Sequence, residues 1–217
     1  RGLGDVYKRQ GLKTTLIITA FAVLIGIVLG FIIAMIRSTH DRTGKMKILN
    51  AICKVYLTVI RGTPAMVQLL IMYYVVFAVH DPGKMITAII AFGLNSAAYV
   101  AEIVRSGIQS IHKGQLEAAM SLGFSKWESM VRIIIPQAIR NILPVIGNEF
   151  VTLIKESSQV SVIGMADLMY TAATIQGISF QPFPPLVIVA VYYFVMTFFV
   201  SSCLRVLEIR LNVRSVR

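Results

Sequence analysis

Three acidic residues lie within or at the edge of otherwise apolar stretches: Glu102, Glu149 and Glu156. A charged side chain at the centre of a bilayer costs about 3 kcal/mol on insertion scales, so each of these residues predicts a specific role. Glu102 precedes Arg105 by three positions. This spacing places both side chains on one helical face, where they can form an ion pair. We interpret this pair as structural.

Glu149 and Glu156 are seven positions apart, which places their carboxylates on nearly the same face of a helix. If that face is turned toward a subunit interface, the two carboxylates form a candidate substrate site, with Asn148 and Ser157 beside them. A structural alternative stays open, in which Lys155 or a base from another helix neutralises the acids.

The sequence carries no pattern typical of an enzyme or a metal site. His40, His80 and His112 all fall in polar connections, so we expect no catalytic group and no metal within the apolar segments. The dipeptide Gly44-Lys45 lacks the remaining residues of a phosphate-binding loop. We therefore expect no ATP hydrolysis by this chain, and an intramembrane enzyme is disfavoured.

The composition is that of a membrane protein. Of the 217 residues, 56% are hydrophobic and 14% are charged, whereas soluble domains contain about 25% charged residues. The net charge of +11 comes from basic residues dispersed between apolar runs, which argues against a nucleic-acid surface. A single membrane domain follows.

Five apolar runs are long enough to cross about 30 Å of hydrocarbon. We place these spans at residues 12–36, 48–79, 85–104, 131–154 and 186–206. The second run is interrupted by Arg61-Gly62-Thr63-Pro64, where proline removes a backbone donor. It is predicted to be a broken helix whose freed backbone groups face protein or a watery cavity. The fold class is therefore all-α, with about five membrane spans.

The connections between the spans differ in basic residues. Residues 37–47, 105–132 and 205–217 contain four Lys or Arg each, whereas 80–84 and 155–184 contain one each. Because basic loops stay in the cytoplasm, this asymmetry predicts a cytoplasmic C-terminus and, with five spans, an external N-terminus. Residues 1–10 lack an apolar core, so we leave them as an uncertain segment before a membrane domain at 11–217.

Residues 113–130 have helical amphipathic spacing, with Leu116, Met120, Gly123 and Trp127 on one face. A surface helix is predicted. It could lie on lipid headgroups. Alternatively, it could dock on another protein, with Gly123 leaving a notch in the apolar face.

This segment resembles the EAA motif found in permease subunits of binding-protein-dependent ABC importers. The matching residues are Glu117-Ala118-Ala119, then Gly123, Ile133 and Pro136. Residues 98–105 and the stretch from Arg61 to Gln68 are similar to the polar amino-acid branch of that family, which includes histidine, arginine and glutamine permeases. The resemblance covers nearly the whole chain from Gly11 onward.

The resemblance implies that residues 113–130 form a cytoplasmic coupling helix that fits a groove on a separate ATPase. The implied contact residues are Gly114, Gln115, Glu117, Ala118, Ala119, Leu122, Gly123, Trp127 and Pro136. This chain would bind no cofactor, because ATP and magnesium belong to the ATPase. The implied partners are two ATPases, a second copy or a similar permease, and an external solute-binding protein. The complex would lie in a prokaryotic plasma (inner) membrane and work by alternating access.

The resemblance also places a transport pathway around the broken helix, at Arg61, Gly62, Thr63, Pro64 and Gln68. In the family, an acid near position 156 is usual, but a neutral residue is common at position 149. The additional carboxylate of Glu149 favours an amino acid with a cationic side chain, such as arginine, lysine or histidine.

One alternative is a permease for glutamine, methionine or a compatible solute. Another is a channel that works alone, although a docking helix argues against it. The segment 160–185, with a helix expected around 166–175, is either an external gate or a plain connection.

Overall fold

The computed structural model describes residues 2–210, and these residues form helices and no strand. The predicted all-α class is confirmed. Two parts of the chain lie outside the described residues: Arg1 and residues 211–217. The first belongs to the uncertain N-terminal segment, and the second contains two arginines of the basic C-terminal connection. Four helices in this part of the chain are long and apolar enough to cross a membrane, or five if a bent helix pair counts as one span.

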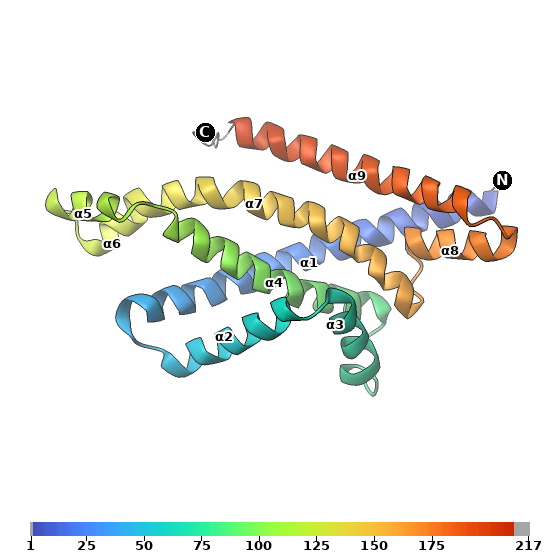
Figure 1. The fold of residues 1–217 in the computed structure, drawn as a ribbon, viewed down its shortest axis with the longest axis horizontal. Helices are drawn as coiled ribbons and strands as arrows, with labels where there is room; N and C mark the ends of the chain where they lie inside the picture. Colours follow the sequence, from blue (N-terminus) through green and yellow to red (C-terminus); the bar gives the residue numbers. More distant parts are fainter. Residues whose placement is uncertain (1, 211–217) are drawn as a thin grey trace.

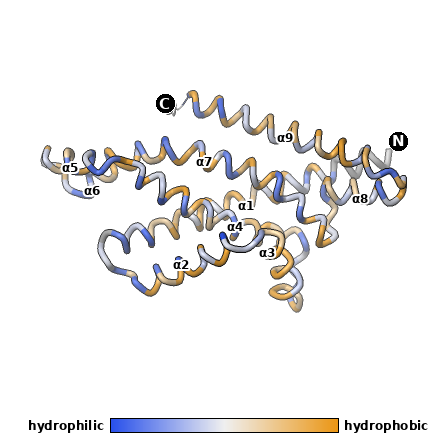
Figure 2. Tube along the Cα trace, viewed as in Figure 1, coloured by the Kyte–Doolittle hydropathy of each residue, from blue (hydrophilic) through white to orange (hydrophobic). Residues whose placement is uncertain are grey.

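Four long helices run along the length of the molecule (Figure 1). They are α1 (Gly2–Thr43), α4 (Lys84–Gln109), α7 (Ile135–Glu156) and α9 (Phe183–Arg210). Figure 2 shows that hydrophobic residues dominate much of their length, whereas hydrophilic residues gather around the turn between α1 and α2 and in α5 and α6. The helices α1, α4 and α9 extend past both ends of the predicted apolar runs. The helix α7 begins four residues after the start of its predicted run and ends two residues beyond it.

The helices α1 and α4 pack closely along a seam of small residues. A methyl group added to Gly26 would lie 2.8 Å from Cβ of Ser96, and one added to Gly30 would lie 2.7 Å from Cβ of Val100. The same four-residue spacing on both helices brings glycine backbone against the facing side chains. This is the close approach that a small-xxx-small pair permits within a membrane.

The second span is broken. The helix α2 (Lys47–Gly62) ends before Pro64, and α3 (Ala65–Ile71) begins after it and continues into a π-helical turn, Met72–Val76. The two helical directions differ by 109°. Pro64 adopts extended backbone, with φ −64° and ψ 138°, so the helical path cannot continue through it. In Figure 1, α3 turns away from the direction of the long helices.

The single helix predicted over residues 113–130 is wrong. The structure has α5 (Lys113–Ser121), a turn, and α6 (Lys126–Ser129), which continues through a π-helical turn, Met130–Ile134, into α7. Gly123 has φ +89°. The N–H of Gly123 donates to Met120 O, and that of Phe124 donates to Ala119 O, so the glycine ends α5 in a Schellman motif. It forms a turn rather than a notch in a helix face.

A short 3₁₀ helix, Ser157–Ile163, follows α7 and leads to α8 (Leu168–Ser179). The helix α8 begins later and ends later than the predicted 166–175, because the buried carboxylate of Asp167 accepts a hydrogen bond from Tyr170 N (2.7 Å) and caps its start. In Figure 1, the turn between α1 and α2, the pair α5 and α6, and the end of α9 lie toward one end of the molecule. The N-terminus and α8 lie at the other.

Candidate functional site

Gln68 binds the backbone groups that the break between α2 and α3 sets free. Its Nε2 donates to Ile60 O (2.7 Å), Thr63 O (3.1 Å) and Thr63 Oγ1 (2.8 Å). Its Oε1 accepts from Asn95 Nδ2 of α4 (2.9 Å). One amide side chain therefore satisfies the last turn of α2 and fastens the break to the neighbouring helix.

Glu102 lies among three arginines. Its carboxylate is 3.1 Å from Arg37 Nη1 of α1, 3.3 Å from Arg105 Nη1 and 3.6 Å from Arg61 Nη1 of α2. The sequence indicated only the partner on the same helix, because spacing within one helix does not reveal contacts from other helices. The guanidinium of Arg61 also lies over the ring of Tyr99, 5.9 Å from its centroid. This cluster joins three helices next to the break.

The two acids of α7 lie together on one face, as their spacing predicted. Both are half-buried, and their carboxylates are close enough to repel each other. Ser96 of α4 lies beside Glu149. Within residues 10–41 and 43–210, no ion pair of 4.0 Å or less involves Glu149 or Glu156, and Lys155 acts on Glu156 only at longer range.

The two polar neighbours of these acids are placed differently. Asn148 is exposed, whereas Ser157 is buried and donates its hydroxyl to Ile154 O (2.7 Å). The hydroxyl of Ser157 is therefore engaged within the chain itself.

The segment α5–α6 exposes large apolar side chains. Leu122 is 79% exposed and Trp127 is 74% exposed. Most of the other predicted contact residues are also exposed: Gln115, Glu117, Ala118 and Gly123. Ala119 is buried, Gly114 is half-buried at the cap formed by His112, and Pro136 lies in the first turn of α7.

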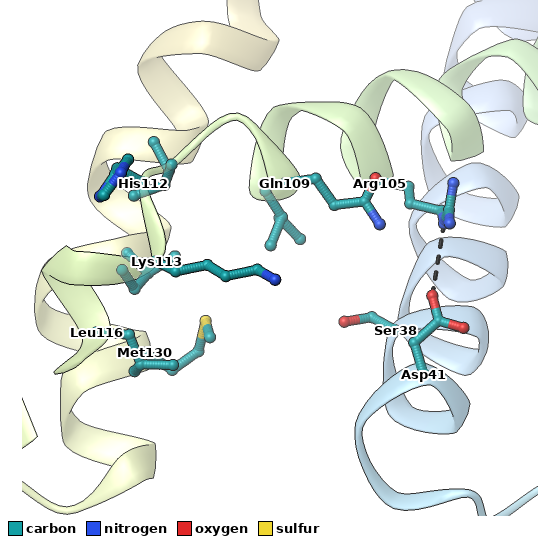
Figure 3. A pocket seen from close by; sticks show the side chains of 11 residues that line it. Ser38, Asp41, Arg105, Gln109, His112, Lys113, Leu116 and Met130 are labelled. Carbon is teal, nitrogen blue, oxygen red and sulfur yellow. Dashed lines mark ion pairs between the residues drawn. The ribbon is translucent and has the colours of Figure 1, made fainter.

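A cavity of about 380 Å³ lies between α5 and the ends of α1 and α4 (Figure 3). The side chain of Lys113 extends into it toward Ser38, and the ion pair between Arg105 and Asp41, at 3.6 Å, lies on the opposite wall. The helix α5 packs instead against α6 and the π-helical turn before α7. These two elements connect α5 to α7, the helix that carries Glu149 and Glu156.

A bundle of membrane-length helices with one broken span and two half-buried acids on one helix face has the features of a membrane transport subunit rather than an enzyme. Residues 26–213 match the family described as the binding-protein-dependent transport system inner membrane component. The chain belongs to this family, which confirms the resemblance seen in the sequence.

Relatives align with most of the chain. A putative glutamine transport system permease protein of Rickettsia bellii is 36% identical over 211 residues, which cover 94% of this chain and 92% of the relative. The arginine transport system permease protein of Bacillus subtilis is 36% identical over 205 residues, which cover 94% and 91%. The glutamine transport system permease protein of Escherichia coli is 36% identical over 207 residues, which cover 94% and 92%.

Solved structures share the fold. A crystal structure of an amino acid ABC transporter with histidines is similar, with a TM-score of 0.86 and 43% identity over 95% of this chain and 94% of the other. An inward-facing methionine ABC transporter has a TM-score of 0.80 over 97% and 99% of the two chains. At 16% identity, it supports the fold alone.

We expect Gln68→Met to destabilise the protein, because the substitution keeps the length of the side chain but leaves backbone acceptors at the break unsatisfied. Gln68 is half-buried, and each of its hydrogen bonds contributes about 0.5–1.5 kcal/mol. The melting temperature of the detergent-solubilised protein should fall. Gln109→Met is the matched control, because Gln109 is exposed. Equal melting temperatures for the two variants would contradict the role assigned to Gln68.

Proposed function

We propose that the chain is the permease subunit of an ATP-driven importer of polar amino acids, and that its cargo carries a cationic side chain. The observation that supports this cargo is the pair Glu149 and Glu156, half-buried on one face of α7 with no ion-pair partner within 4.0 Å among residues 10–41 and 43–210. Relatives named for glutamine and for arginine are equally similar, at 36% identity. They support a polar amino acid as the cargo, but they do not distinguish a cationic side chain from a neutral one.

Electrostatics favours arginine, lysine or histidine over glutamine. Two carboxylates that repel each other in a partly dehydrated site are stabilised by a cation placed between them. Hydrogen bonds with a charged donor and a charged acceptor are roughly twice as strong as neutral ones. A neutral amide leaves the repulsion uncompensated. Glutamine is therefore the alternative cargo, followed by methionine or a compatible solute.

The segment α5–α6 is the proposed contact with the ATPase. Protein interfaces bury large apolar and aromatic side chains at their centre, and Leu122 and Trp127 are well suited to this role because both are largely exposed. Glu117 is exposed on the same segment. The basic connections lie toward the same end of the molecule (Figure 1). By the positive-inside rule, this end faces the cytoplasm, and the N-terminus lies outside.

The remaining partners follow from the size and orientation of the chain. Five spans are too few to enclose a pathway comfortably, so a second permease, identical or similar, completes it. Two ATPases, which bind ATP and magnesium, act on the α5–α6 end. A solute-binding protein delivers the amino acid to the α8 end. Alternating access then exposes the cargo site first to one side and then to the other.

Replacing Leu122 with serine tests the coupling contact. We expect the amount of ATPase that co-purifies with the permease to fall about 5-fold or more, because a central apolar contact contributes more than about 1 kcal/mol to binding. ATP-dependent uptake should fall in parallel, with little change in melting temperature. Leu207→Ser on α9 is the control, because Leu207 is also exposed. Unchanged ATPase association with weaker binding to lipid vesicles would identify α5–α6 as an interfacial helix instead.

Replacing Glu149 with glutamine tests the cargo. In proteoliposomes with the ATPase and the binding protein, we expect ATP-dependent arginine uptake to lose about 10-fold or more in kcat/KM, because a charge-assisted hydrogen bond contributes about 1.5–3 kcal/mol. Glu208→Gln, at the far end of α9, should leave uptake unchanged. Unchanged arginine uptake by Glu149→Gln would refute the role of Glu149 in recognising the cation, and wild-type uptake of glutamine in preference to arginine would refute the cationic cargo. If the wild-type complex took up no amino acid with ATP, the importer itself would be refuted.

A further inference from the structure

Arg61 is the least neutralised arginine of the Glu102 cluster. Arg37 and Arg105 lie 3.1 and 3.3 Å from the carboxylate, whereas Arg61 lies 3.6 Å away, beyond the usual range of a hydrogen bond. The side chain of Arg61 is also the most exposed of the three, at 42% against 13% and 26%. Arg105 also pairs with Asp41 at 3.6 Å, so the two carboxylates balance two of the three guanidinium groups, and Arg61 is the one left with the weakest partner.

This surplus charge faces a cavity. Arg61 lines a space of about 420 Å³ between α1, α2 and α4, together with Lys54, Arg37, Glu102 and the hydroxyl-bearing Thr58. The lining has three basic side chains and one acidic side chain, a surplus of two positive charges. Inside a membrane, such a surplus is costly unless an anion or water occupies the space. The cavity is therefore suited to an oxyanion.

Two sources of an oxyanion can reach this cavity. Glu102, 3.6 Å from Arg61, lies two residues before the end of the predicted span 85–104, and Arg37 and Arg105 directly follow the predicted spans of their helices. The cavity therefore lies near the cytoplasmic boundary of the hydrocarbon, within reach of a lipid phosphate as well as of a solute. The position of Glu149 favours the solute.

The helix α4 relates Arg61 to the acids of α7. Arg61 lies over Tyr99, and Glu149 lies beside Ser96, three positions earlier on α4, or about 4.5 Å along its axis. A surplus guanidinium and an unpaired carboxylate thus flank α4 at similar depths. An amino acid with a cationic side chain carries the complementary pair of charges, a carboxylate at one end and a cation at the other.

We propose that Arg61 binds the α-carboxylate of the amino acid in transit. This inference rests on the proposed function. The planar fork of a guanidinium can hold a carboxylate through two parallel hydrogen bonds, while Glu102 and Tyr99 position the fork. Every amino acid carries an α-carboxylate, so Arg61 recognises the class of cargo, whereas Glu149 selects its side chain. Glutamine and arginine, for which relatives of this chain are named, both carry this carboxylate.

The test compares arginine with agmatine, which is arginine without its carboxylate. Binding of both radiolabelled compounds is measured on the permease–ATPase complex without the binding protein, which would otherwise select the ligand. We expect the wild type to bind arginine at least about 10-fold more tightly than agmatine. Arg61→Gln should lose this preference by weakening arginine alone. Arg61→Lys should restore only part of it, and Arg205→Gln, on α9 outside the cavity, should keep it.

Three results would overturn the inference: equal weakening of arginine and agmatine by Arg61→Gln, no preference in the wild type, or no binding of either compound. A lipid source is tested separately in nanodiscs of neutral lipid. Stabilisation by added anionic phospholipid that disappears in Arg61→Gln would assign the cavity to lipid. ATP-dependent arginine uptake by the wild type, measured in parallel, shows whether the proposed function stands when this inference fails.

Discussion

The break between α2 and α3 exposes backbone carbonyls that need partners, and the hydrogen bonds of Gln68 provide them. Within hydrocarbon, each unsatisfied backbone group costs several kcal/mol, so an unsupported break would unfold or straighten. Gln68 binds the carbonyls of Ile60 and Thr63 and is itself held by Asn95. Because α2 stops here, Arg61 comes to lie at the last turn of a helix, beside α4, with 42% of its side chain exposed.

The helix α4 organises the rest of the molecule around this point. On one side, the glycines of α1 allow its backbone to approach closely. On another side, α2 is joined to it through Glu102 and through the hydroxyl of Tyr56, which donates to Leu94 O. A third side meets α7 near Glu149. The charged groups of the chain are thus held at fixed positions by packing, which is the condition for electrostatic recognition in a dry site.

Much of this arrangement could be predicted from the sequence. Apolar runs long enough to span a bilayer identified the helices, Pro64 identified the break, and the seven-residue spacing placed Glu149 and Glu156 on one face. Periodicity reveals which residues share a face, but not which helix that face meets. The contacts of Glu102 with Arg37 and Arg61, and the role of Gln68 as the partner of broken backbone, therefore required the structure.

The division between α5 and α6 was missed for a different reason. Gly123 was interpreted as a gap in one amphipathic face, although a glycine also ends helices through a left-handed conformation. Ser125 and Glu128 follow it with the spacing of a capping box, and the structure shows this box at the start of α6. A glycine followed by this motif is the signal that could have predicted two helices.

A structure of the permease–ATPase complex with bound arginine tests the central claim most directly. The account predicts that the ligand lies against α4 between α2 and α7, with its guanidinium at Glu149 and its carboxylate at Arg61. A ligand in the reverse orientation, or one bound away from both side chains, would contradict the account.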